Sequence, residues 1–155
     1  MPNNDTLMFT ATEHGQDMHA KVKDFIATQI EPIEAEFWQE CHGLNPDGNW
    51  QNWQWPAAYE NLRKQAREAG LWNLFLPDDE LGAGLSVTDY APIAELTGHS
   101  LLAPHIFNCN APDSGNMELL WRYGSKEQQD KWLTPLLDGK TRSVFCMTEP
   151  DVASS

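Results

Sequence analysis

The sequence predicts an all-α fold, a bundle of about five to six helices, followed by one β-strand near the C-terminus. Two observations favour helices. Apolar residues recur at steps of three and four along one stretch, which places them on a single helix face: Met18, Val22, Phe25, Ile26, Ile30, Ile33 and Phe37. Helix-capping residues and glycine stops then recur at helical spacing. Only residues 143–148 (SVFCMT) have the composition of a strand.

The composition excludes several classes of function. Among 155 residues, 10 Lys and Arg oppose 23 Asp and Glu, so the formal net charge is −13. This surplus of acids disfavours binding to nucleic acid or to an anionic membrane surface. The three cysteines are widely spaced and form no disulfide or zinc-ligand pattern. The sequence shows no signal peptide and no apolar run long enough to span a bilayer, so we expect a cytoplasmic protein.

The first predicted helix runs from Asp17 to about Cys41, after a loose N-terminal arm over residues 1–15. Pro32 should kink this helix or split it in two. Three tryptophans follow at Trp50, Trp53 and Trp55. We expect these rings to cover the core from a loop. A stacking surface for bases or sugars is disfavoured, because no Lys or Arg lies between Lys23 and Arg63.

The remaining helices are predicted from their ends. A second helix should begin at Pro56 and end at Gly70, and a third should begin at the Ser86 cap and end at Gly98. Between them we expect a short buried run (LWNLFLP) and an exposed acidic loop (PDDELGAG). Residues 99–112 indicate a short helix or a buried connection. Two further helices should span 113–123 and 125–137, the second starting with an S-x-x-Q capping box.

Tests for common catalytic motifs are negative, and we predict no metal site. The nearest metal-like pair, Glu95 and His99, falls at a helix end. Neither a complete dinucleotide-binding glycine motif nor a G-x-S-x-G serine motif occurs. Cys109 and Cys146 have apolar neighbours in the sequence and are predicted to be inert core thiols. The chemically informative part is the end, FCMTEPDVASS, where a strand enters a turn of small residues. Such a turn can present backbone N–H groups and hydroxyls to a polar ligand, or be an ordinary strand exit.

Residues 145–155 (FCMTEPDVASS) resemble the flavin-binding motif of acyl-CoA dehydrogenases, in which an aromatic residue and a hydrophobic residue precede T-E-P-x-x-G-S-D. Three upstream segments resemble the same family in the same order, at 70–77, 108–118 and 124–139. The similarity is strongest to the branch that is fused to a kinase-like domain in some animals. Two positions depart from the general motif, Ala153 in place of Gly and Ser155 in place of Asp, and that branch commonly has the same residues.

The resemblance implies an N-terminal helical domain over residues 16–142 and the start of a middle β-barrel domain over 143–155, truncated after its first strand. It implies FAD as the cofactor and α,β-dehydrogenation of an acyl-CoA thioester, with hydride transfer to the flavin. Phe145, Met147 and Thr148 would contact the flavin, and Ser154 would reach both the cofactor and the pantetheine arm of the substrate. The family's catalytic glutamate belongs to a C-terminal domain, so no catalytic residue is expected in this chain.

The resemblance also implies an electron-transfer flavoprotein as partner and a homo-oligomer for the complete enzyme. We therefore expect the chain to be the N-terminal portion of such an enzyme and to be inactive alone. The alternative is a non-catalytic acidic helical module that binds a partner protein and retains the family's fold.

Overall fold

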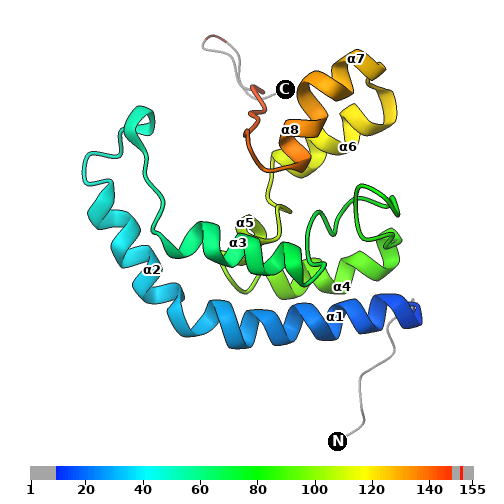
Figure 1. Ribbon diagram of the computed structural model, residues 1–155, viewed down its shortest axis with the longest axis horizontal. Helices are drawn as coiled ribbons and strands as arrows, with labels where there is room; N and C mark the ends of the chain where they lie inside the picture. The colour runs from blue at the N-terminus through cyan, green and yellow to red at the C-terminus, as the bar shows by residue number, and fades with distance from the viewer. Residues whose placement is uncertain (1–9, 148–150, 152–155) are drawn as a thin grey trace, which may run out of the picture.

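The computed structural model describes residues 10–147 and residue 151, and in this part of the chain it contains helices, turns and no strand (Figure 1). The predicted all-α fold is confirmed. The elements, in chain order, are α1 (Glu13–Phe25), the π-helical turn η1 (Ile26–Ile30), α2 (Glu31–Leu44), the 3₁₀ turn η2 (Trp50–Asn52), α3 (Ala58–Glu68), α4 (Val87–Thr97), α5 (Ala103–Ile106), α6 (Asp113–Tyr123), α7 (Lys126–Gln128), the π-helical turn η3 (Gln129–Leu133) and α8 (Thr134–Leu137).

Helices α1 and α2 form one long bent helix, and the predicted effect of Pro32 is confirmed. Proline has no N–H and therefore cannot continue the regular hydrogen-bond pattern of an α-helix. The preceding turn, η1, widens to π geometry, in which the N–H of Glu31 donates to the carbonyl of Ile26. Figure 1 shows the resulting change of direction: α1 lies along α4, whereas α2 turns away from that axis.

The long helix starts and ends outside the predicted limits. It begins at Glu13, so residues 13–15 are helical and not part of a loose arm. Thr12 caps α1, and its N–H and hydroxyl both donate to Asp89 Oδ1, at 2.7 and 3.0 Å. The helix also continues past Cys41 to Leu44, because the Asn45 side chain caps its last turn by donating to the Cys41 carbonyl at 2.8 Å. Neither cap follows from apolar periodicity.

The other predicted helices are confirmed with boundaries within two residues, except that the helix predicted over 125–137 consists of α7 and α8 joined by the π turn η3. Ser86 and Asp89 form a complete capping box at the start of α4, as do Ser125 and Gln128 at the start of α7. The stop after α3 also behaves as predicted, since Gly70 has a φ of +72° and lies just beyond the helix.

The main core lies among α1, η1, α2, α3, α4 and α5 and the loops that join them. It contains seventeen buried apolar residues: Met18, Val22, Phe25, Ile26, Ile30, Phe37, Tyr59, Leu62, Ala66, Leu71, Leu74, Leu85, Ile93, Leu102, Ala103, Ile106 and Phe107. The predicted role of the tryptophans is confirmed for Trp55, which stacks on Tyr59 with ring centroids 4.3 Å apart and packs against this core. Trp53 contacts Trp55 but is 41% exposed.

Helices α6 to α8, which we call the hairpin, surround a second and smaller apolar cluster. Its buried members are Leu76, Met117, Leu133, Leu136 and Leu137. The hairpin stands above α3 and α5 in Figure 1. The last carbonyls of α8 point toward the main core, where polar side chains bind them.

This junction between the two clusters is made of hydrogen bonds. Asn108 donates to Asn73 Oδ1 at 2.7 Å and to the Leu136 carbonyl at 3.0 Å, and Trp72 Nε1 donates to the Leu137 carbonyl at 2.7 Å. Arg63 donates to the carbonyl of Gly139 at 2.9 Å. These side chains thus bind carbonyls at and just beyond the C-terminal end of α8.

The predicted strand over residues 143–148 is wrong for the part that can be checked. Residues 143–147 form neither helix nor strand, and Thr148 lies outside the described residues. A strand requires a neighbouring strand for its backbone hydrogen bonds, and the rest of the described chain provides none.

Candidate functional site

The segment that precedes the predicted flavin motif lies beside the hairpin, close to the start of α6. Of the four predicted cofactor-binding residues, the structure describes Phe145 and Met147, whose exposed fractions are 66% and 58%. Thr148 and Ser154, including its predicted substrate contact, lie outside the described residues. The structure therefore places two of these residues near each other on the surface, and it does not test their predicted roles.

Asp113, the first residue of α6, anchors the start of this segment. Its Oδ1 accepts from the backbone N–H of Ser143 at 2.7 Å and from the Ser143 hydroxyl at 2.6 Å. Its Oδ2 lies 2.8 Å from Arg142 Nε in an ion pair, and the Asp113 side chain is only 2% exposed. Asn116, one turn further along α6, donates to Ser143 Oγ at 2.8 Å. Residues 142–143 are thus attached to α6 by side-chain contacts rather than by a sheet.

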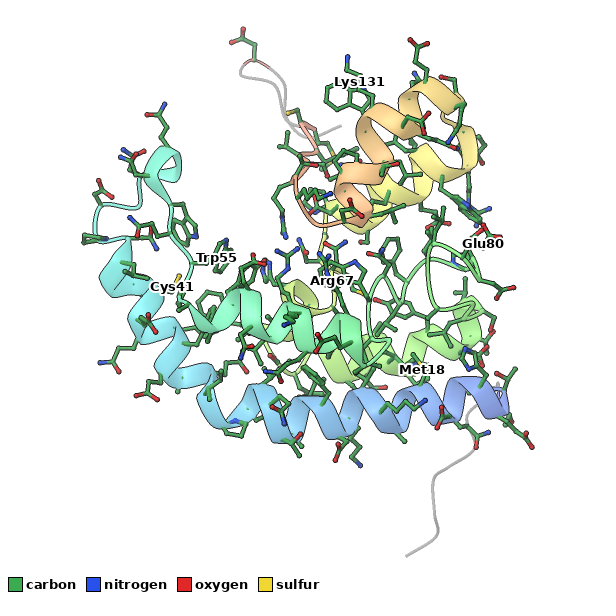
Figure 2. The ribbon with its side chains drawn as sticks, in the orientation of Figure 1. Met18, Cys41, Trp55, Arg67, Glu80 and Lys131 are labelled. Carbon is green, nitrogen blue, oxygen red and sulfur yellow. The ribbon has the colours of Figure 1, made fainter. Side chains whose placement is uncertain are left out.

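Next to this anchor lies a groove of about 550 Å³, which we call the apolar groove. Its lining residues are Asn116, Leu119, Leu120, Lys131, Trp132, Leu136, Thr141, Arg142, Ser143 and Val144. Trp132 and Val144 remain 54% and 74% exposed. Large apolar side chains that are open to water commonly mark a surface that another group covers. In Figure 2, Lys131 is labelled at the outer end of the hairpin, where its ammonium lies 4.7 Å from the centre of the Trp132 ring.

The other side of the anchor connects to the aromatic residues of the main core. Arg142 lies 3.4 Å from His105 Nδ1, and the His105 ring lies 5.6 Å from that of Trp55, which Figure 2 labels before α3. Burial, together with the nearby positive charge of Arg142, lowers the pKa of His105 to about 4. His105 is therefore neutral at physiological pH and can accept a hydrogen bond from Arg142.

The arrangement suits binding rather than proton transfer. The groove lining contains no Asp, Glu, His or Cys among the described residues, so these groups supply no general base there. Apolar walls and the adjoining exposed Phe145 can flank a flat aromatic ring, and backbone groups of the segment can supply polar contacts to its edge. The described residues can therefore form one apolar wall of a binding site for a flat aromatic ring, and this wall is open on its other side.

The thiols agree only partly with the sequence prediction. Burial raises the pKa of Cys109 to about 11, which makes it unreactive as predicted. Cys146, predicted to be a core thiol, is exposed. It follows the anchored residues in a segment that no described strand covers. Within residues 10–147 and 151, no group of three or more His, Cys, Asp or Glu residues could hold a metal ion. None of the helices that the structure describes is sufficiently long and apolar to cross a membrane.

Sequence reasoning missed Asp113 and the groove. The local pattern predicts Asp113 only as a helix start, because its partner Ser143 lies 30 residues away and no local pattern connects the two. No sequence signal marks the groove, because Trp132 stands at i and i+4 with Leu136 and its exposure appears only in the structure.

Comparison with known proteins gives consistent results. The family "Acyl-CoA dehydrogenase, N-terminal domain" matches residues 12–140. The chain is 48% identical over 157 residues to acyl-CoA dehydrogenase family member 11 from Homo sapiens, covering 100% of the chain and 20% of that relative. It is 45% identical over 143 residues to family member 10 from Mus musculus, covering 89% and 13%.

A solved structure of an acyl-CoA dehydrogenase homologue from Mycobacterium abscessus is 51% identical, with a TM-score of 0.84. The similarity covers 94% of this chain and 37% of that one. The chain thus spans about a fifth or less of the two animal relatives and over a third of the solved structure.

Proposed function

Because the chain belongs to the acyl-CoA dehydrogenase family through its N-terminal helical domain, we propose that it serves as the N-terminal portion of an FAD-dependent acyl-CoA dehydrogenase. The reaction is α,β-dehydrogenation of an acyl-CoA thioester, in which FAD accepts the hydride. The observation that carries this proposal is the exposed segment at Phe145 and Met147, which directly follows Val144 of the open apolar groove in a domain with this fold.

In this proposal the chain's own residues bind and orient. Phe145, Met147 and Thr148 contact the flavin, and Ser154 contacts both the cofactor and the pantetheine arm of the substrate. The hairpin supplies an apolar surface that excludes water from one side of the site. Proton abstraction falls to a glutamate outside this chain, which agrees with a groove lining that has no carboxylate.

The proposed domain division follows from the same roles. Residues 16–142 form the helical domain, and residues 143–155 begin a middle β-domain. An added β-domain would supply strands that could pair with residues 143–148, which the described chain alone cannot do. Electron-transfer flavoprotein as electron acceptor and a homo-oligomeric state belong to the complete enzyme.

A chimeric enzyme tests the proposal directly. This chain would replace the matching part of the Mycobacterium abscessus homologue, to which it is 51% identical. Bound FAD would be measured from the visible flavin absorbance, and turnover from acyl-CoA-dependent reduction of an electron acceptor. We expect near-stoichiometric FAD and measurable turnover. The matched control is the 155-residue chain alone, for which we expect neither.

A folded chimera without flavin would contradict the proposal. It would favour the alternative function, a non-catalytic acidic module that binds a partner protein. That alternative is consistent with the net charge of −13 and with the same exposed groove. Flavin binding and turnover by the isolated chain would contradict our expectation that further domains are required.

A further inference from the structure

The contacts of Asp113 converge on two consecutive residues of the chain. Both carboxylate oxygens have a partner: Oδ1 accepts hydrogen bonds from the N–H and the hydroxyl of Ser143, and Oδ2 lies 2.8 Å from Arg142 Nε in an ion pair without hydrogen-bond geometry. One hydrogen bond would leave the chain free to rotate about it. Contacts to a backbone N–H, its own side chain and the preceding side chain fix both the position and the direction of the segment.

Ser143 is held from both sides. Its hydroxyl donates to Asp113 and accepts from Asn116, so its donor and one acceptor site are in use. Both partners belong to α6, a regular helix that also carries Leu119 and Leu120 of the groove wall. The segment is therefore bound to α6, the same rigid helix that forms part of the wall of the apolar groove.

Burial strengthens the hydrogen bonds and the ion pair that the Asp113 carboxylate makes. The Asp113 side chain is 2% exposed, so water competes little for its lone pairs. Its location in the first turn of α6 also lets the helix dipole stabilise the negative charge. Phe145 follows the anchored Ser143 by two residues, a reach of at most about 7 Å along the chain.

We propose that Asp113 is the positioning residue that directs residues 144–147 along the apolar groove and so orients the cofactor-binding segment. The identity of the cofactor as FAD rests on the proposed function, whereas the anchoring itself does not. Asp113 would act through Ser143 and Arg142 and would not touch the flavin.

Hydrogen exchange in the 155-residue chain tests the anchoring without any cofactor. The exchange rate of the Ser143 amide would be measured by NMR, with the amide of buried Ile93 in α4 as an internal reference for global unfolding. We expect Asp113→Ala to lower the protection of Ser143 about tenfold relative to Ile93, because a charge-assisted hydrogen bond is lost. Asp113→Asn should have a smaller effect, and Ser143→Thr, which keeps the hydroxyl, should have little effect.

Two control variants separate positioning from stability. Asp89→Asn alters another buried carboxylate, which binds Thr12 and Ser86 and does not contact residues 142–147. Glu118→Gln removes an exposed charge from α6 itself, where Glu118 pairs with Arg122. Both should leave the protection of the Ser143 amide unchanged, whereas Asp89→Asn, which opens the capping box of α4, should lower that of Ile93 in the same helix. Unchanged Ser143 protection in Asp113→Ala, or an equal loss at both amides, would overturn the anchoring.

The FAD affinity of the chimera supplies the second measurement. We expect Asp113→Ala to weaken FAD binding about tenfold, while Glu118→Gln leaves it unchanged. If Ser143 loses protection but FAD affinity stays the same, the positioning role is wrong although the anchor exists. If the unmutated chimera folds without FAD, the proposed function fails, and the exchange experiment still decides whether Asp113 fixes the segment.

Discussion

The main core and the hairpin are both helical, yet they differ in how they bury apolar side chains. The main core surrounds seventeen buried apolar residues, whereas the hairpin surrounds five and leaves Leu119, Trp132 and Tyr123 more than half exposed. Apolar burial is the main contribution in the first region, where Asp89 also binds Thr12 and Ser86. The second depends on the hydrogen-bonded junction at the end of α8 and presents its remaining apolar surface outward.

This difference in apolar burial suggests that the two regions of the domain have different roles, one in folding and one in binding. The region with the complete core can support the fold, and the incompletely covered hairpin faces the groove and the proposed cofactor segment. Figure 2 labels Arg67 on α3, between the two regions, where it donates to the Asp138 carbonyl and stacks 3.9 Å from the centre of the Trp72 ring. The contact between the regions is thus polar and aromatic rather than a continuous apolar core.

The largest loss of stability should come from the main core. Phe107 is fully buried and packs edge-on against Phe25, with ring centroids 5.5 Å apart. We expect Phe107→Ala to lower the free energy of unfolding by about 4 kcal/mol, through lost burial and the cavity that remains. Urea denaturation followed by circular dichroism measures this. A loss below about 1 kcal/mol would show that the core can collapse around the gap, and would weaken the contrast between the regions.

A smaller loss should follow from opening the junction. Asn108 is 1% exposed and joins Asn73 to the end of α8. Asn108→Ala removes the donor to Asn73 Oδ1 and to the Leu136 carbonyl. We expect the free energy of unfolding to fall by about 2–3 kcal/mol. Exposed Asn61 on α3 offers a control, since Asn61→Ala should change stability by less than about 0.5 kcal/mol. Hydrogen exchange should show the hairpin opening before the main core; simultaneous opening would mean that the two regions are one cooperative unit.

Acidification should lower the free energy of unfolding through His105, which lies beside Arg142 at the boundary of the two regions. The folded-state pKa of His105 is lowered to about 4, below its ordinary value of 6.5, mainly by burial. The unfolded chain therefore binds this proton more readily, and stability should decline as the pH falls from about 6.5 toward 4. An NMR titration of the His105 ring measures the pKa. Arg142→Gln should raise it by removing a neighbouring positive charge, and an unshifted pKa in that variant would place the cause in burial alone.

The smallest effect on stability should come from the groove. Trp132 is 54% exposed, so Trp132→Ala should change the free energy of unfolding by only about 0.5 kcal/mol. The same change should reduce binding of a fluorescent apolar dye, because it removes part of the exposed apolar surface. A large loss of stability, or unchanged dye binding, would show that the hairpin's outer face serves folding in the same way as the core.

The sequence predicts those parts of the fold that depend on neighbouring residues. The capping boxes at Ser86 and Ser125 lie within four residues of their partners, and the Pro32 bend follows from one ring and one missing N–H. Prediction fails where partners are distant. The helix start at Glu13 depends on Asp89, 77 residues from Thr12, and the anchor of Ser143 depends on Asp113.

The candidate site shows the same division. Composition predicts a strand over 143–148, but a strand forms only with a partner, and the described chain provides none. Phe145 and Met147 are predicted as site residues from the resemblance of residues 145–155 to a family motif, and not from the physical chemistry of the segment. The groove beside them arises from the packing of α6 against η3 and α8, and no single segment contains it.

The π-helical turn at Ile26–Ile30 also sets a limit on insertions and deletions. Each residue of an α-helix advances the direction of its side chain by about 100°. A one-residue deletion in this turn would restore regular α geometry and leave the later side chains of α2 facing nearly the same way, because the π turn holds one residue more than an α turn over about the same rotation. The same deletion between Pro32 and Phe37, where the helix is regular, would instead turn Phe37 and Cys41 away from the core side by about 100°. The π turn is therefore the place in the long helix where the loss of one residue disturbs the core least.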